Sequence, residues 1–255
     1  MILTITNQKG GVGKSTTAQC LSIGLAQKNK KVLLIDFDPQ RNLTFCFNLL
    51  NNEYTILDVL RGNCNIKQAI HSTNGINIIP SDIELNNADN EFTKSPMILK
   101  DVLNEIKNDY DFIIIDTPPT LSSITYLSLI ASDNLIIPLN ADIFGIQGLT
   151  TLANKINIIK QGSNPSLNIT GILLTKFNER TILNRDVKEY IENVAKQLDT
   201  KLFKTYIRES VAVRESQLKK QCVLEYSPKN NVSKDYLNFI NEFLKEVKKW
   251  VKTLK

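Results

Sequence analysis

The sequence has few of the residues that build metal sites and disulfide frameworks. It contains one histidine and four cysteines, and the cysteines are widely scattered with no C-x-x-C pair. Such spacing indicates reduced thiols rather than a zinc site or a set of disulfides, and reduced thiols are typical of a cytoplasmic protein. The single histidine, His71, precedes a turn, which favours a surface residue over a catalytic base.

Long apolar runs are also missing. No apolar stretch approaches the ~20 residues that a membrane-spanning helix needs. The N-terminal segment MILTITNQKGG has no basic region ahead of a longer apolar one, so a secretory signal is not expected. We find no linker, low-complexity stretch or internal repeat, and therefore expect a single α/β domain over residues 1–255.

Charge is unevenly distributed along the chain. The formal net charge is +5 over 255 residues, of which 42% are hydrophobic and 22% charged, as in ordinary globular proteins. Residues 201–220 have a net charge of +4 and residues 234–255 a net charge of +3, so the remainder is slightly acidic. Two basic segments favour a polyanionic partner, either nucleic acid or a membrane surface. A genome-wide bias toward Lys and Asn is the alternative explanation.

Short apolar segments alternate with longer helical patterns. Near-continuous Ile, Leu and Val runs are typical of strands buried on both faces of a parallel sheet. The expected strands are 2–6, 31–36, 76–80, 111–116, 134–139 and 168–175, with a weaker candidate at 202–207. The expected crossover helices include 15–29, 97–108, 146–161 and 182–198. This pattern predicts a doubly wound, mostly parallel α/β sheet with helices on both faces and ligands at the carboxyl ends of its strands.

The segment NQKGGVGKST, residues 7–16, is a glycine-rich loop between the first strand and the first helix. Its glycines allow backbone N–H groups to surround phosphate oxygens, and the following helix adds its positive N-terminal end. These glycines are Gly10, Gly11 and Gly13. Lys14 is suited to the β- and γ-phosphates and the Ser15 hydroxyl to Mg²⁺, so the loop predicts nucleotide binding.

The loop departs from the pattern G-x-x-x-x-G-K-[ST] at two positions. Gln8 occupies the place of the first glycine, and beside it stands a second lysine, Lys9. The ordinary pattern assigns no role to a lysine at this position, so Lys9 is expected to contact a group other than those that the pattern binds.

Three aspartates follow two of the expected strands. Asp116 ends the strand 111–116 and is suited to hold Mg²⁺ through water, although a solvated aspartate at a strand end is the simpler alternative. Asp36 and Asp38 lie in the segment DFDPQRN, at the end of the strand 31–36, and face the same region. One of the two can contact the metal shell while the other orients an attacking water, and the residues alone do not say which.

The loop from Lys9 to Ser15 resembles the deviant Walker A phosphate loop of the ParA/MinD ATPases, and DFDPQRNLT, residues 36–44, is similar to the ParA/Soj partitioning branch. Further matches cover essentially the whole chain, at 79–85, 110–121, 171–183 and 223–239. The absence of an added N-terminal DNA-reading domain makes it look like the short, Soj-type form. The resemblance implies a P-loop ATPase with ATP and Mg²⁺ as cofactors.

The resemblance also implies roles for individual residues. Lys9 would cross to the phosphates of a partner subunit, in a homodimer that sandwiches two ATP molecules. Asp38 matches the aspartate associated with hydrolysis, so the catalytic set is Lys9, Lys14 and Asp38. The nucleotide-binding set adds Gly10, Gly11, Val12, Gly13, Ser15 and Thr16. The implied metal set is Ser15, Asp36 and Asp116.

One segment departs from the family pattern. Many relatives have Ile-Pro-Arg-Asn-Val and Ser-Glu-Ala-Pro where this chain has YIRESV at 206–211 and RESQ at 214–217. In the family this region helps to hold the adenine and lies near the DNA-contacting surface. We assign base contacts to Asn178 and Arg208. The residues expected to grip DNA phosphates are Lys204, Arg208, Arg214, Lys219 and Lys220.

The expected protein is a cytoplasmic, nucleoid-associated bacterial ATPase. It would bind DNA without sequence preference as an ATP dimer and leave on hydrolysis stimulated by a ParB-like centromere-binding partner. A MinD-like membrane-positioning ATPase is the alternative, because residues 236–255 have an apolar helical stripe. A terminal helix docked on the core explains the same stripe and is favoured, so no stable membrane association is expected. Metabolic ligases are a third class, whereas iron–sulfur relatives are excluded because no cysteine lies between 65 and 221.

Overall fold

The computed structural model describes residues 1–73, 75–88, 91–120, 122–179 and 182–253. Its described residues form a seven-stranded sheet in the order β3-β4-β2-β5-β1-β6-β7, in which only β3 is antiparallel to its neighbour. The strands are β1 (Ile2–Ile5), β2 (Val32–Asp36), β3 (His71–Thr73), β4 (Ile76–Ile79), β5 (Phe112–Asp116), β6 (Asn134–Asn140) and β7 (Asn168–Thr175). The predicted doubly wound, mostly parallel α/β sheet is therefore confirmed.

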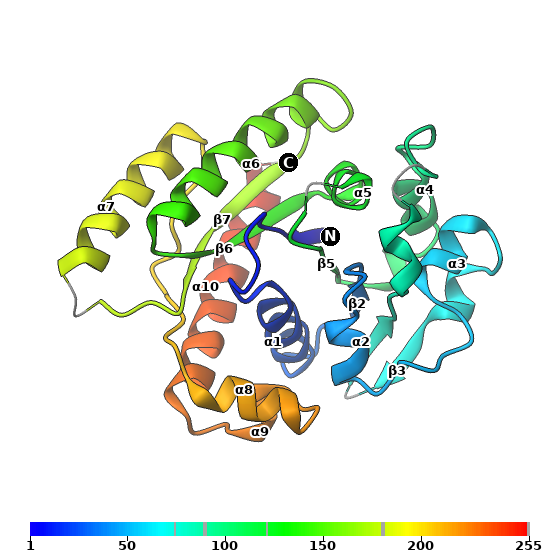
Figure 1. The fold of residues 1–255 in the computed structure, drawn as a ribbon, viewed down its shortest axis with the longest axis horizontal. Coiled ribbons are helices and arrows are strands. Elements are labelled where there is room, and N and C mark those ends of the chain that lie inside the picture. Colours follow the sequence, from blue (N-terminus) through cyan, green and yellow to red (C-terminus); the bar gives the residue numbers. More distant parts are fainter. Residues whose placement is uncertain (74, 89–90, 121, 180–181, 254–255) are drawn as a thin grey trace.

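Helices cover both faces of the sheet (Figure 1). The first half of the chain contributes α1 (Lys14–Ala26), α2 (Asn42–Cys46), α3 (Ile56–Arg61), α4 (Ile98–Asn104) and α5 (Ser123–Ala131). The second half contributes α6 (Ile143–Gln161), α7 (Ile182–Gln197), α8 (Val211–Leu218), α9 (Val223–Tyr226) and α10 (Asn231–Thr253). α1 and α10 pack on one face, and α3 to α7 cover the other.

Side chains alternate between the two faces along each central strand. Leu34 of β2 and Ile114 of β5 point toward α1 and α10, whereas Leu33 and Ile113 point toward α3 to α5. All four are fully buried, which explains why the strands read as continuous apolar runs rather than as alternating ones. Every strand flanking β1 runs parallel to it, so the carboxyl ends of β1, β2, β5 and β6 meet at one edge of the sheet.

The predicted strand at 202–207 is wrong. Only isolated bridges join Leu202 and Ile207 to β7. Between them, the carboxylate of Glu242 on α10 accepts hydrogen bonds from the backbone N–H groups of Lys204, at 2.8 Å, and Thr205, at 2.9 Å. A side chain from α10 therefore takes the donors that a strand would pair with its neighbour.

Other elements differ in extent or were not expected. The predicted helix 97–108 ends as α4 at Asn104 and is followed by a separate 3₁₀ turn. His71, expected at the surface before a turn, begins the short edge strand β3 and is half-buried there. α5 was not expected, because its apolar run SITYLSLIA does not by itself distinguish a helix from a strand.

The C-terminal helix α10 packs along α1 on the sheet. Gly24 of α1 allows the close approach, since a Cβ there would collide with the Cδ1 atom of Ile240 on α10. The apolar stripe of α10 contacts the core as far as Val247. This is the arrangement that the docked-helix interpretation predicts. Over the residues described, none of the helices has the length and apolar character needed to cross a membrane.

Candidate nucleotide-binding site

The glycine-rich loop joins the end of β1 to the start of α1. Gly11 and Gly13 have φ values of 74° and 84°, in the left-handed region that favours glycine. The carbonyl of Gly13 accepts the Thr17 N–H at 2.8 Å, so α1 begins directly at the loop. Val12 between them is fully buried, and its carbonyl accepts the Thr175 hydroxyl at the end of β7. The loop is therefore fixed from both sides and presents its N–H groups at the helix start.

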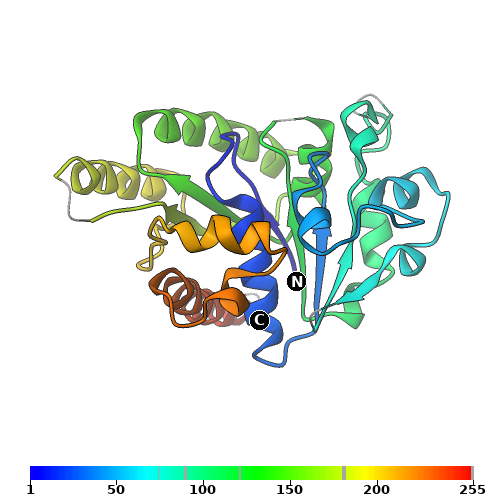
Figure 2. The ribbon, with the colours of Figure 1, turned by 60° about the horizontal axis from the view of Figure 1, so that its bottom comes forward.

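A cavity of about 720 Å³ lies over this loop. It brings together most of the residues predicted to bind nucleotide or catalyse its hydrolysis, namely Gly10, Gly11, Gly13, Lys14, Ser15, Thr16 and Asp38. Its outer wall is formed by α2 and by α8, which crosses in front of the start of α1 (Figure 2). Gln217 of α8 donates a hydrogen bond to the Thr16 hydroxyl at 3.3 Å, so α8 contacts the phosphate loop directly.

Lys14 is almost fully buried between the loop and two carboxylates. Its Nζ atom donates to the carbonyl oxygen of Lys9 at 3.3 Å. Burial lowers the pKa of Lys14, and the negative charges of Asp116 and Asp38 partly offset that effect. The Lys14 ammonium therefore lies beside the loop, where a bound triphosphate would take the place of the Lys9 carbonyl as its hydrogen-bond acceptor.

Asp116, at the end of β5, is fully buried beneath the loop. Neither of its carboxylate oxygens has a hydrogen-bond partner among the described residues. Burial raises its pKa well above the usual range, and the charge of neighbouring Asp36 adds to the rise; the nearby Ser15 hydroxyl and Lys14 ammonium act in the opposite direction. A buried carboxylate without a partner is costly, and Ser15 and Asp116 together fit the oxygen ligands that Mg²⁺ prefers.

Asp36 differs from Asp116 although the two are paired in register on β2 and β5. Its Oδ2 atom accepts the backbone N–H and the hydroxyl of Thr44, both at 2.7 Å, and burial raises its pKa to about 6. The carboxylate is therefore engaged in holding the start of α2. This geometry favours a structural role for Asp36, and its membership of the metal set stays a prediction.

Asp38 lies at the rim of the cavity and is 3% exposed. Its Oδ1 atom accepts the Gln40 N–H at 2.9 Å. Burial raises its pKa, while the Gln40 N–H and the charge of Lys14 lower it. Of the two aspartates in the DFDPQ segment, Asp38 is the one that lines the cavity, and its role in hydrolysis stays a prediction.

Lys9 points away from the cavity of its own chain. Its ammonium donates to Asp142 Oδ2 at 2.6 Å and lies 6.0 Å from the centre of the Phe144 ring. The side chains of Lys9 and Asp142 are 31% and 39% exposed, so the pair lies at the surface. Asp142 was not foreseen, although an aspartate directly after a strand and before a helix is a common N-cap signal.

The two residues assigned to the base lie in a neighbouring hollow of about 610 Å³, which Asn178 and Arg208 both line. The guanidinium of Arg208 is already engaged, because its Nε and an Nη atom donate to the two carboxylate oxygens of Asp235 at 2.7 and 2.9 Å. Asp235 lies on α10. The two predicted residues therefore lie together in the structure. Arg208, however, is paired with Asp235, which the sequence near Arg208 could not indicate.

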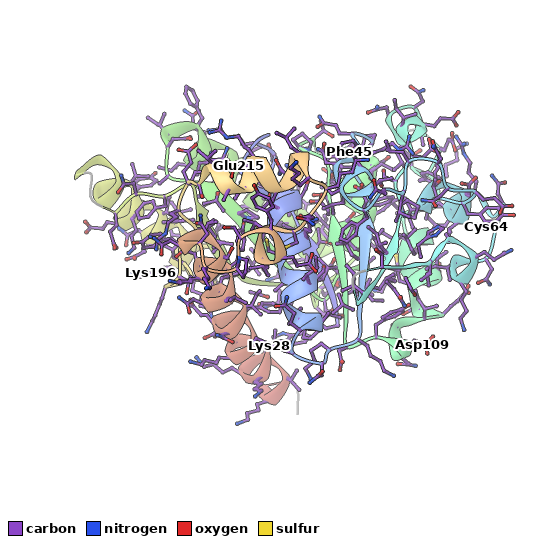
Figure 3. All side chains as sticks on the ribbon, turned by 90° about the horizontal axis from the view of Figure 1, so that it is seen from below. Lys28, Phe45, Cys64, Asp109, Lys196 and Glu215 are labelled. Carbon is purple, nitrogen blue, oxygen red and sulfur yellow. The ribbon has the colours of Figure 1, made fainter. Side chains whose placement is uncertain are left out.

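The predicted DNA-contacting residues divide between two elements. Lys204 and Arg208 lie beside α10, whereas Arg214, Lys219 and Lys220 belong to α8 and its end. Arg214 also lines the nucleotide cavity. Lys220 reaches α2, where its ammonium donates to Asn48 at 2.7 Å and lies 4.5 Å from the centre of the Phe45 ring. α8 and α2 share one edge of the molecule, as the labelled Glu215 and Phe45 illustrate (Figure 3).

Sequence comparisons identify the family of the chain. Residues 1–169 match the family model described as an AAA domain. The sporulation initiation inhibitor protein Soj of Bacillus subtilis is 35% identical over 248 residues, which cover 94% of this chain and 97% of that protein. The chromosome-partitioning ATPase Soj of Treponema pallidum is 37% identical over 219 residues, which cover 84% and 85% of the two chains.

The chain belongs to the ParA/Soj family of partitioning ATPases. Among solved structures, cobyrinic acid a,c-diamide synthase from Mycobacterium smegmatis with bound ADP and magnesium is similar, with a TM-score of 0.83 and 27% identity; the match covers 97% of this chain and 95% of that one. The ParA/Soj member described here is an ATPase with ATP and Mg²⁺ as its cofactors. When bound, Mg²⁺ would neutralise charge that develops on the phosphates, and Ser15 and Asp116 are the residues suited to hold it.

Proposed function

We propose that this ParA/Soj ATPase partitions a chromosome or plasmid by forming an ATP sandwich dimer that binds DNA. The position of Lys9 carries the proposal. Of the two lysines in the loop, Lys14 lines the cavity of its own chain, whereas Lys9 is paired with Asp142 at the surface and is still partly exposed. A γ-phosphate at a subunit interface needs a cation from each side, and a surface lysine on a flexible stem can supply the second one.

DNA binding without sequence preference follows from charge in this proposal. Arg214, Lys219 and Lys220 give one subunit only a weakly basic face at the end of α8. Two such faces placed side by side double the number of phosphate contacts, so dimerisation would raise DNA affinity steeply. The DNA-bound state would associate the protein with the nucleoid.

Hydrolysis ends the bound state. Asp38 is the residue we assign to orienting the attacking water, and turnover should be slow without a partner. A ParB-like centromere-binding protein would stimulate it by ordering the loops that carry Asp38 and Asp116 or by adding a cation near the γ-phosphate. Separation of the dimer then releases the DNA and lets the cycle move a cargo.

The fold alone does not distinguish this function from a metabolic ligase, since the similar synthase has the same architecture. The DFDPQ segment and the Soj relatives favour partitioning. Hydrolysis that DNA and a partner protein stimulate, with no small acceptor molecule present, would separate the two.

The substitution Lys9→Ala tests the dimer. The variant should bind ATP with near-normal affinity, because Lys14 remains, but should sediment as a monomer with Mg²⁺ and ATP. Lys28→Ala is a matched control, since Lys28 is an exposed lysine at the opposite end of α1 (Figure 3). A Lys9→Ala protein that forms the same ATP dimer as the control would exclude the cross-subunit role.

A further inference from the structure

A buried hydrogen-bond network connects the ends of β2 and β4 to α2. The hydroxyl of Thr44 donates to Asp36 Oδ2 at 2.7 Å and accepts the backbone N–H of Ser81 at 2.8 Å. The Ser81 hydroxyl donates to the backbone carbonyl of Asp38 at 2.7 Å. Thr44, Ser81 and Asp36 are fully buried, and Asp38 is nearly so. We refer to these contacts as the Thr44–Ser81 network.

The network holds the backbone of Asp38 on both sides. Its N–H donates to Asp36 Oδ1 at 3.3 Å, and its carbonyl accepts the Ser81 hydroxyl. These two hydrogen bonds fix the peptide groups on either side of Asp38. The Cα–Cβ bond of Asp38 therefore already points in a defined direction before nucleotide binds. Displacing a reacting group by about 1 Å can cost about 100-fold in rate, so this constraint bears on hydrolysis directly.

The network is itself attached to rigid parts of the sheet. Thr44 is held at the start of α2 by a second bond, from its own N–H to Asp36 Oδ2 at 2.7 Å. Ser81 follows β4, and the carbonyl of its neighbour Pro80 accepts the N–H of Ile56 at the start of α3, at 2.9 Å. The position of Asp38 therefore depends on β2, β4 and two helices rather than on its own loop alone.

We propose that Thr44 and Ser81 are positioning residues for ATP hydrolysis, which hold Asp38 in place without touching the nucleotide. The inference rests on the proposed role of Asp38. Neither Thr44 nor Ser81 lines the cavity, so an effect of either side chain on turnover would act through the residues that the network holds, of which Asp38 is the one that lines the cavity. The hydroxyl of Thr44 donates and accepts at once, which an apolar side chain of the same shape cannot do.

Three substitutions separate the hydroxyl groups from packing. Thr44→Val keeps the shape but removes the hydroxyl, Thr44→Ser keeps the hydroxyl, and Ser81→Ala removes only the bond to the Asp38 carbonyl. We expect Thr44→Val and Ser81→Ala to lower kcat at saturating Mg·ATP by about tenfold or more. The dissociation constant for ATP should stay within about twofold, and Thr44→Ser should recover most of the rate.

A second comparison uses a variant without the positioned group. In an Asp38→Ala background, Thr44→Val should cause no further loss of the residual rate, because residues that act as a unit are not additive. A purely structural residue would lower the melting temperature and the ATP affinity in both backgrounds. Circular dichroism and a fluorescent ATP analogue measure these two quantities for every variant.

The outcomes discriminate clearly. A normal kcat for Ser81→Ala and Thr44→Val, with a slow Asp38→Ala, would overturn the positioning role while leaving the role of Asp38 intact. Equal slowing of Thr44→Val and Thr44→Ser would assign the effect to shape and would also overturn it. Wild-type turnover by Asp38→Ala would instead refute the role of Asp38 itself. If Thr44→Val fails to fold, Ser81→Ala alone decides, since it removes a single hydroxyl.

Discussion

Asp116 is buried without a hydrogen-bond partner among the described residues, and Asp36 lies beside it in register on the next strand. Two neighbouring carboxylates under one loop are costly unless a cation joins them, because burial and mutual repulsion both oppose ionisation. Asp36 accepts two hydrogen bonds from Thr44, whereas Asp116 accepts none among the described residues and is offset only by the nearby Ser15 hydroxyl and Lys14 ammonium. The free-energy cost of burying an ionised carboxylate is therefore larger at Asp116 than at Asp36.

At the residue scale, Asp116→Asn should stabilise the protein when Mg²⁺ and nucleotide are removed with EDTA. A neutral amide avoids the repulsion by Asp36, and a gain of about 1 kcal/mol corresponds to a rise of about 2–4 °C in Tm for a chain of this size. Burial raises the pKa of Asp116, so the native state keeps a proton that the unfolded chain releases above pH ~4, and stability falls as pH rises. The gain from Asn should therefore grow with pH.

The same variant should lose the extra stabilisation that Mg²⁺ gives to the ATP-bound protein. Asp109→Asn is a suitable control, because Asp109 is an exposed aspartate far from the loop (Figure 3). A lower Tm in EDTA together with an intact Mg²⁺ effect would contradict the role given to Asp116.

Residues defined by spacing along the chain were predictable, and residues defined by a distant partner were not. Gly10, Gly11 and the residues from Gly13 to Thr16 lie around one cavity because the loop pattern encodes its own geometry, whereas Val12 is fully buried. The engagement of Arg208 depends on Asp235, 27 residues further on, and that of Asp36 on Thr44 across a turn. No local pattern contains those contacts.

At the element scale, α6 begins beside the phosphate loop and shares its N-cap residue with Lys9. Asp142 Oδ1 accepts the Gly145 N–H at 2.7 Å and caps the helix, while Oδ2 accepts the Lys9 ammonium. A Cβ on Gly145 would lie 2.5 Å from the Asn140 carbonyl, so α6 starts in close contact with the end of β6. In the proposed dimer, Lys9 would therefore have to break its ion pair with Asp142 before it could reach the partner subunit.

Asp142→Asn keeps a side chain that can cap α6 and removes the charge that holds Lys9. An exposed ion pair contributes at most about 1 kcal/mol, and each dimer breaks two such pairs. We therefore expect dimerisation with ATP to tighten by a few-fold, and by about thirtyfold at most. Analytical ultracentrifugation across an ATP titration measures this shift. Unchanged or weaker dimerisation would mean that Asp142 does not restrain Lys9.

α10 supplies the element-scale test of the membrane alternative. Its apolar stripe is packed against the core as far as Val247, so removal of residues 248–255 should leave Tm within about 2 °C, since few buried contacts are lost. Neither the full chain nor the shortened one should sediment with anionic liposomes in ATP. Liposome binding by the full chain that disappears on truncation would support the MinD-like function instead.

Elements buried on both faces were the easiest to predict. The apolar runs of β1, β2 and β5 indicate parallel strands without any knowledge of their neighbours. The segment 202–207 failed because Glu242, on a helix much later in the chain, takes its backbone donors. α5 could not be assigned because a short buried helix and a buried strand have the same apolar composition.

At the scale of the whole molecule, three of the predicted DNA-contacting residues, Arg214, Lys219 and Lys220, lie on or directly after α8, which walls the nucleotide cavity. Gln217 of α8 contacts Thr16 in the phosphate loop, and Lys220, just after α8, lies over Phe45 of α2. If these basic residues bind DNA as proposed, the nucleotide and the DNA share one helix, through which ATP can change the basic face. In this account the dimer, rather than the single chain, is the DNA-binding unit.

Co-sedimentation of the purified protein with DNA tests this account most directly. It is measured without nucleotide, with ADP and with ATP, each at two salt concentrations. We predict binding only with ATP, and markedly weaker binding at the higher salt, because counterion release from phosphates drives it. Equal binding in all three nucleotide states, or no binding in any of them, would contradict an ATP dimer as the DNA-binding form.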